Sequence, residues 1–276
     1  MVKKVIHMAD LHIPNDMKER PYDAMLKQLM ADVLKEVKKS DSPDDVRVVV
    51  AGDIFHNKIK ATNEARRVFH ELLNYLNAIC KTVIIAGNHD MLESNMDRTD
   101  SITPTFEIDG VYPNVNFMDR SLGYKSGYSV DDGVVWVLYS MFDKAAKPNI
   151  DGIRDLYPNH RLIGLYHGDI AGAVTDTGRM SESGVDSDYF VGLDCVMAGH
   201  IHKRQTIKKN GVPIVYAGSV FQVNMGENIS GHGFVVWDLE EMTNKAHDVK
   251  NKYRTLKFNI TSYEDVANDL EQIINL

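Results

Sequence analysis

The sequence predicts an α/β protein built around a parallel sheet, and three observations support that prediction. Short aliphatic runs recur along the chain, each about the length of a buried strand. Segments with apolar residues at three- and four-residue spacing, typical of amphipathic helices, separate the first three runs. With 276 residues the chain can also bury one large core. Alternating strands and helices pair the strands in parallel through right-handed crossovers.

The amino-terminal part supplies three strands and two helices. The strands are predicted at residues 4–9, 46–51 and 82–86. The first helix begins near Pro21 and ends near Lys38, where basic residues suit the negative end of the helix dipole. Thr62 or Asn63 is expected to cap the second helix, whose apolar face repeats with helical spacing through Ile79.

The remainder of the chain predicts a second sheet. Beyond residue 90 the sequence is more polar, and glycines and prolines separate short apolar runs. Strands are predicted at residues 115–118, 134–139, 162–166, 194–198, 204–208, 212–217 and 233–239. Turn residues between the last three are typical of hairpins. Residues 253–260 alternate like one more strand, and residues 262–274 have the pattern of a short capped helix.

The composition excludes some classes of protein. No apolar run approaches the ~20 residues that a membrane span requires, and the amino terminus lacks the apolar stretch of a signal peptide. A cytoplasmic or otherwise intracellular protein is therefore expected. Cys80 and Cys195 lie in apolar surroundings and are expected to be buried free thiols. The net charge of -8 disfavours nucleic-acid binding through overall charge, but bound divalent cations permit it locally.

Five of the apolar runs end in side chains that bind metals well. These side chains belong to Asp10, His12, Asp53, Asn88, His167, His200 and His202. The carboxyl ends of parallel strands are where open α/β sheets place their sites. A single Asp-x-His or His-x-His pair arises often by chance, whereas five such strand ends in one chain do not.

These donors predict a hydrolase with two metal ions. Phosphodiester hydrolysis requires an activated water and neutralisation of charge on the phosphate oxygens, which a metal pair supplies. Mixed oxygen and imidazole donors suit Mn²⁺, Fe or Zn²⁺, whereas Mg²⁺ favours oxygen alone. Asp53 follows the middle of the first three strands and is the candidate to bridge the two ions.

The same residues resemble the calcineurin-like metallophosphoesterases, whose pattern is Asp-x-His, Gly-Asp, Gly-Asn-His-Asp/Glu, His and Gly-His-x-His. The resemblance implies a four-layer α/β/β/α sandwich. It places one metal on Asp10, His12, Asp53 and His202, and the other on Asp53, Asn88, His167 and His200. It also implies that His89 contacts the scissile phosphate and assists the leaving oxygen. Asp90 is expected to support this loop.

Within that family, residues 51–56, 194–203 and 216–227 resemble the SbcD-type DNA nucleases. That branch implies a Mn²⁺-dependent exonuclease, with some single-strand endonuclease activity, in DNA repair or recombination. His56 would help orient the substrate. DNA and an SMC-like coiled-coil ATPase are the implied partners, and a homodimer is a further expectation. Residues 1–250 are then the nuclease domain, and residues 251–276 an extension that begins the capping domain of this branch.

Two alternatives stay open on the same residues. The same site would serve a phosphatase or a cyclic-nucleotide phosphodiesterase, since only the substrate differs. A non-catalytic scaffold on this fold is the other alternative, but such proteins lose metal ligands, and here all seven are present.

Overall fold

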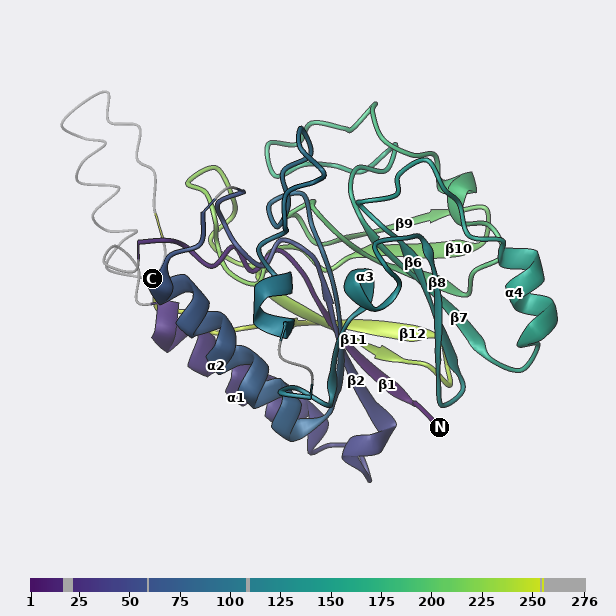
Figure 1. The fold of residues 1–276 in the computed structure, drawn as a ribbon, viewed down its shortest axis with the longest axis horizontal. Helices are drawn as coiled ribbons and strands as arrows, with labels where there is room; N and C mark the ends of the chain where they lie inside the picture. Colours follow the sequence, from purple (N-terminus) through teal and green to yellow (C-terminus); the bar gives the residue numbers. More distant parts are fainter. Residues whose placement is uncertain (17–21, 59, 108–109, 254, 256–276) are drawn as a thin grey trace, which may run out of the picture.

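In a computed structural model the chain forms two six-stranded mixed sheets, packed face to face and flanked by helices (Figure 1). The structure describes residues 1–16, 22–58, 60–107, 110–253 and 255. The predicted four-layer α/β/β/α sandwich is confirmed. The strand predicted at 253–260 and the helix at 262–274 lie almost wholly outside the described residues, so the domain boundary near residue 250 stays a prediction.

The first sheet has the strand order β12-β11-β1-β2-β3-β4. Its parallel part consists of β1 (Lys4–Met8), β2 (Val46–Ala51), β3 (Lys81–Ile85) and β4 (Val115–Phe117). On the far side of β1 lie two antiparallel strands, β11 (Gly233–Asp238) and β12 (Thr243–Asp248). The predicted parallel pairing of the first three strands is confirmed.

Two helices, α1 (Tyr22–Val37) and α2 (Asn63–Ile79), cover the outer face of this sheet (Figure 1). Thr62 is the N-cap of α2, because its Oγ1 accepts the amide of Ala65 at 3.3 Å. Residues on β1 alternate between the two faces of the sheet: Ile6 packs toward these helices and Val5 toward the second sheet. The alternation of apolar residues therefore fixes which face of β1 turns toward the helices, and this also fixes where the loop after β1 begins.

The second sheet has the strand order β5-β6-β7-β8-β10-β9. Four parallel strands form its centre, namely β6 (Val134–Tyr139), β7 (Arg161–His167), β8 (Cys195–Gly199) and β10 (Val212–Tyr216). Antiparallel strands β5 (Gly127–Asp131) and β9 (Gln205–Lys209) form its edges. On its outer side lie α4 (Ile150–Leu156) and the 3₁₀ turn η3 (Ser187–Phe190).

Three short elements complete the described part of the chain. They are the 3₁₀ turns η1 (Pro43–Asp45) and η2 (Thr103–Phe106), and the single-turn helix α3 (Met118–Ser121). None of the described helices combines the length and apolar character that crossing a bilayer requires. Cys80 and Cys195 are both buried and free, as predicted.

One predicted pairing is wrong. Strands β9 and β10 form the expected hairpin, but β10 and β11 do not pair, because they belong to different sheets. The chain crosses from one sheet to the other between them, and on the way Ser219 pairs with Ala9 beside the end of β1. Strand β12 was not predicted, because its exposed, polar edge sequence shows no alternation.

Candidate metal centre

Strands from both sheets end at a common edge, and the residues that follow them meet there. The first sheet contributes the loops after β1, β2 and β3, and the second contributes the ends of β7 and β8. All seven predicted metal ligands lie in this region, together with His89. His12 and His202, which are 190 positions apart in sequence, are thus brought into contact.

Asp10, His12 and His202 form the first donor cluster. Each offers one ligand atom within 4.8 Å of the others. The Nε2 atoms of His12 and His202 lie 2.9 Å apart. His12 and Asp10 are buried, at 5% and 0% exposure, so neither reaches water freely. Two imidazole nitrogens that converge beside a buried carboxylate match the donor chemistry of a transition-metal ion.

Asp53, His167 and His200 form the second donor cluster. His167 Nε2 lies 3.3 Å from an oxygen of Asp53. Asn88 joins this cluster, since its Oδ1 lies 3.2 Å from His167 Nε2 and 2.9 Å from His200 Nδ1. The cluster therefore combines two imidazoles, an amide oxygen and a carboxylate.

Asp53 of the second cluster also reaches the first cluster. One of its oxygens is 3.3 Å from His167 of the second cluster, and the other is 3.5 Å from His12 of the first. That position suits a carboxylate that bridges two ions. The histidine and aspartate clusters thus fit a two-metal site, while the assignment of each ligand to one ion stays a prediction.

Two of the histidines are oriented by hydrogen bonds from Nδ1, the ring nitrogen that faces away from the centre. His167 Nδ1 donates to the carbonyl of Ala51 at 2.7 Å, and His202 Nδ1 donates to Glu227 Oε1 at 2.8 Å. With Nδ1 as the donor, each ring can offer the lone pair of Nε2 to a cation at the centre once the second ring proton is displaced. Such partners fix the tautomer and orientation of metal-binding histidines.

Glu227 is a functional residue whose role the sequence did not reveal. Its carboxylate is buried and also accepts hydrogen bonds from the amides of Val223 and Asn224 and from Ser219 Oγ. The glutamate lies 25 residues after His202, so no short spacing connects the two. Gly226-Glu227 was recognised only as part of the family resemblance.

The buried charges of the centre shift one another's pKa values. Burial raises the pKa of Asp10 to about 6. Burial would also raise the pKa of Asp53, but the charge and hydrogen bond of His167 hold it well below its usual value. Asp53 in turn raises the pKa of His167 to about 9, against the lowering effect of burial. The opposed shifts of Asp53 and His167 favour a positive charge between these groups, which a bound cation would also supply.

His89 is held beside Asp53 by two hydrogen bonds. Its backbone amide donates to Asp53 Oδ1 at 2.8 Å, and its Nδ1 donates to the carbonyl of His56 at 2.6 Å. Its ring centroid lies 4.8 Å from that of His12 and 6.0 Å from that of His56. Nε2 is the other ring nitrogen, and its contact with a phosphate oxygen stays a prediction.

Asp90 supports the loops and does not join the donors, as predicted. Its carboxylate accepts the backbone amides of Ile54, Phe55 and Gly87, which ties the loop after β2 to the loop after β3. Burial, followed by repulsion from Asp53, raises the pKa of Asp90 to about 7.

Two glycines allow the loops to approach one another. A Cβ atom at Gly87 would overlap the carboxylate and amide of Asp53. A Cβ atom at Gly199 would overlap the carbonyl of Ala51, where the two sheets converge. Both positions need glycine because of this close approach of the backbones.

These elements define a metal-dependent phosphoesterase. The sequence pattern of the calcineurin-like phosphoesterases matches residues 3–204. The chain belongs to this family.

Two curated proteins are similar to the chain. An uncharacterized protein, R555, of Acanthamoeba polyphaga mimivirus is 32% identical over 256 residues. That match covers 91% of this chain but only 18% of the mimivirus protein. The SbcD subunit of the nuclease SbcCD of Staphylococcus saprophyticus is 25% identical over 290 aligned residues, which cover 96% of this chain and 74% of the staphylococcal protein.

The fold also resembles a solved structure described as a novel archaeal phosphodiesterase. The TM-score is 0.41 and the identity 12%, over 88% of this chain and 97% of that one. Values this low indicate nothing about the substrate.

Proposed function

We propose that the chain is a DNA nuclease that hydrolyses phosphodiester bonds with two divalent ions, Mn²⁺ being the expected metal. The observation that carries the proposal is the position of His89, held by Asp53 and the His56 carbonyl beside two donor clusters. The similarity to the staphylococcal SbcCD nuclease subunit over nearly the whole chain supports a nuclease. The proposal includes exonuclease and single-strand endonuclease activity in DNA repair or recombination, as the resemblance of residues 51–56, 194–203 and 216–227 to the SbcD-type nucleases implies.

The residues divide the work of hydrolysis among them. When bound, two divalent ions activate a water and offset the charge on the phosphate oxygens. Asp53 holds the two clusters at a fixed separation, because one oxygen faces each. His89 directs Nε2 at the phosphate, and in its doubly protonated form it can give the Nε2 proton to the departing oxygen and keep the Nδ1 proton on the His56 carbonyl. His56 orients the ring of His89 through its carbonyl, and its own exposed ring lies where it can orient the DNA strand.

Two substitutions test this proposal. Asp53→Asn removes the negative charge that both ions would share. It should lower kcat/KM for linear DNA by ~1000-fold or more, since each 1.36 kcal/mol added to the activation free energy slows the reaction tenfold. Asn also tolerates the left-handed backbone, φ 54°, that Asp53 adopts. His89→Gln should lower kcat by ~100-fold, the ordinary contribution of a general acid. His70→Gln on α2 is the matched control and should leave the rate unchanged.

The choice of substrate separates the proposal from its alternatives. With Mn²⁺, the wild-type protein should cleave linear DNA and bis(p-nitrophenyl) phosphate and should act poorly on p-nitrophenyl phosphate. Faster hydrolysis of the monoester would indicate a phosphatase, and faster hydrolysis of a cyclic nucleotide would indicate a cyclic-nucleotide phosphodiesterase. A protein that binds Mn²⁺ but hydrolyses none of these would be a scaffold.

We also propose that the chain works with a coiled-coil ATPase and forms a homodimer. The name of the staphylococcal relative marks it as one component of a complex. Co-purification with such an ATPase, and light scattering of the isolated chain, test the two associations separately. A chain that stays monomeric and alone in both experiments would refute them.

A further inference from the structure

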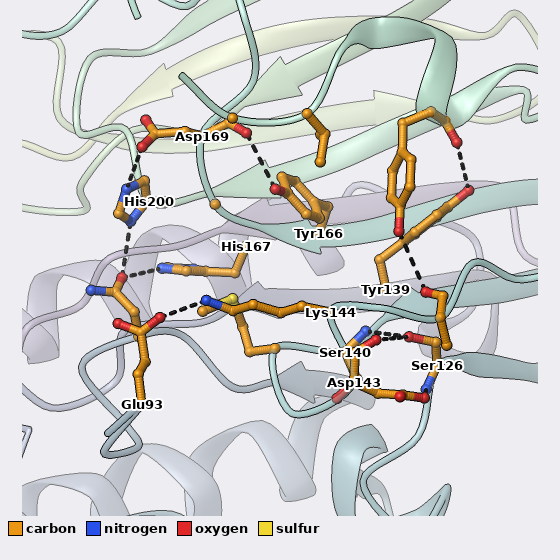
Figure 2. Close-up of a pocket in the computed structure, with 17 residues that line it drawn as sticks. Glu93, Ser126, Tyr139, Ser140, Asp143, Lys144, Tyr166, His167, Asp169 and His200 are labelled. Atoms are coloured by element: carbon orange, nitrogen blue, oxygen red, sulfur yellow. Dashed lines mark hydrogen bonds and ion pairs between the residues drawn. The ribbon is translucent and has the colours of Figure 1, made fainter. Parts of the chain in front are cut away.

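A cavity of about 380 Å³ opens beside the second donor cluster (Figure 2). Asn88, His167 and His200 line one end of it, so the cavity and the candidate metal centre share a wall. Its volume lies in the range of small-molecule sites. The hydrolytic roles described above use none of its other residues. The cavity can therefore accommodate a group attached to the phosphate at the centre.

Three tyrosines form an aromatic wall in this cavity. Tyr139 ends β6, Tyr166 lies on β7 and Tyr189 on η3. The ring centroid of Tyr139 lies 6.5 Å from that of Tyr166 and 5.1 Å from that of Tyr189. The hydroxyls of Tyr166 and Tyr189 donate to the carbonyls of Asp169 and Ala146. These bonds hold the rings in place, so the wall is a preformed aromatic surface.

The end of the cavity away from the donor cluster is polar. Figure 2 shows His167 and His200 on one side and Ser126, Ser140 and Asp143 on the other, with Tyr166 between the two groups and Tyr139 next to the serines. Asp143 is half-buried, and its Oδ2 accepts the amide of Ser126 at 3.1 Å. A hydroxyl and a carboxylate at this end can hydrogen-bond the edge of a planar heterocycle.

Lys144 provides a positive charge at the rim of the cavity. Its side chain is 58% exposed and pairs with Glu93 at 2.5 Å. Lys58, from the loop that follows β2, lies 3.6 Å from the same glutamate. Lys144 and Glu93 line the cavity together with Asn88 of the candidate metal centre, and a phosphate can compete with Glu93 for the lysines.

We propose that this cavity binds the nucleoside attached to the scissile phosphate, with its base against the tyrosine wall and its polar edge toward Asp143 and Ser126. An aromatic wall, a hydrogen-bonding end and an adjoining phosphate site match the three parts of a nucleotide. This inference rests on the proposed nuclease function and deepens it. A base stacked in a duplex cannot enter the cavity, so the chain selects unpaired nucleotides.

Binding measurements test the cavity without requiring DNA cleavage. The probes are thymidine 5′-monophosphate and 2-deoxyribose 5-phosphate, titrated calorimetrically into the Mn²⁺-loaded protein. They share the phosphate and sugar and differ in the base. Stacking of one base on aromatic side chains is worth ~1–3 kcal/mol, so the nucleotide should bind about tenfold more tightly.

Variants at Tyr189 identify the surface responsible. This half-buried tyrosine lies on η3 outside both sheets, so its replacement disturbs the fold least. Tyr189→Leu should abolish the tenfold preference for the nucleotide, and Tyr189→Phe should retain it, because the ring is kept. Tyr75→Leu, on α2 away from the cavity, is the matched control and should behave as wild type.

The outcomes distinguish the cavity from the nuclease activity. Equal affinity of the wild-type protein for both probes, or a preference that survives in Tyr189→Leu, would overturn the cavity proposal. The wild-type comparison decides this even if a variant fails to fold. Selective nucleotide binding by a protein that does not cleave DNA would support the cavity and refute the nuclease. DNA cleavage without selective binding would do the reverse.

Discussion

The hydrogen bond between Glu227 and His202 allows a sharp test of the metal centre. Glu227→Gln preserves side-chain volume but removes a carboxylate oxygen. One oxygen accepts hydrogen bonds from His202 Nδ1 at 2.8 Å and from the backbone amide of Asn224 at 3.0 Å. The other oxygen accepts hydrogen bonds from the backbone amide of Val223 at 2.9 Å and from Ser219 Oγ at 3.3 Å. Because donors surround both oxygens, the amide group of glutamine has no suitable position.

The magnitude follows from the two orientations of that glutamine. If its NH₂ faces His202, it donates to Nδ1, and the ring proton moves to Nε2, where it blocks the centre. If its NH₂ faces Val223, two donors oppose each other at a cost of ~1–3 kcal/mol. Loss of such a partner typically weakens metal binding by ~10- to 100-fold. We expect this loss at the first donor cluster only.

Mn²⁺ titration across pH supplies the assay. Burial would lower the pKa of His202, but its hydrogen bond to Glu227 raises that pKa to about 9. Mn²⁺ must therefore displace this proton below pH 9, and wild-type affinity should rise with pH up to about 8.5. In Glu227→Gln the pKa of His202 falls, so Mn²⁺ binding should release about one proton fewer. The slope of log affinity against pH should decrease by about one unit. The 10- to 100-fold loss is expected near pH 8.5, where wild-type His202 gives up its proton most easily.

A second buried glutamate provides the control for that experiment. Glu36 lies on α1, is 7% exposed and pairs with Lys39, outside both donor clusters. Glu36→Gln should leave Mn²⁺ binding unchanged. If Glu227→Gln binds two Mn²⁺ ions with wild-type affinity and wild-type pH slope, then His202 does not bind metal through Nε2, and the assignment of the first cluster fails.

Three further predictions follow from the buried groups. Burial lowers the pKa of His7 to about 3, so the stability it contributes is complete above pH 6.5 and is lost as the pH falls toward 3. The free energy of unfolding should therefore fall between pH 7 and pH 4.5, and in His7→Leu this fall should be smaller by about 2.5 kcal/mol. Urea unfolding in EDTA measures it, and an equal fall in wild type and His7→Leu would contradict the burial effect. Gly87→Ala should abolish Mn²⁺ binding, because its Cβ overlaps Asp53, whereas Gly226→Ala, with open space around the added Cβ, should bind Mn²⁺ normally. Removing the metal with EDTA should lower the melting temperature in wild type and not in Gly87→Ala, since an ion that binds only the folded state stabilises it; an equal decrease in both would place the metal elsewhere.

The fold was largely predictable because its elements follow local rules. Strands β2 and β6 and helix α1 were predicted to within a residue or so, since aliphatic runs and helical spacing are local signals. The pairing of β11 was not predictable in this way. It depends on contacts with β1, more than 200 residues away, and turn residues before β11 give no information about which sheet it joins.

The donors of the site were predictable, but their supports were not. Asp10 and His12 come directly after a strand, so their residue types and spacing carry the signal. Glu227 and Asp169 act through histidines far from them in sequence: Asp169 Oδ2 lies 3.6 Å from His200 Nε2. Only folding creates these pairs. The tyrosine cavity was missed for the same reason, because three separate elements build it.

The backbone at the centre departs from the rules that make the rest of the fold predictable. Asp10, His12, Asp53 and His200 all adopt positive φ angles, at 54°, 45°, 54° and 99°. Such conformations cost of order 1–3 kcal/mol each for residues other than glycine. The buried parallel strands that precede these residues hold them there. Side chains that would otherwise continue along each strand are thereby turned toward one point, so the strain in the backbone produces the convergence that two-metal chemistry requires.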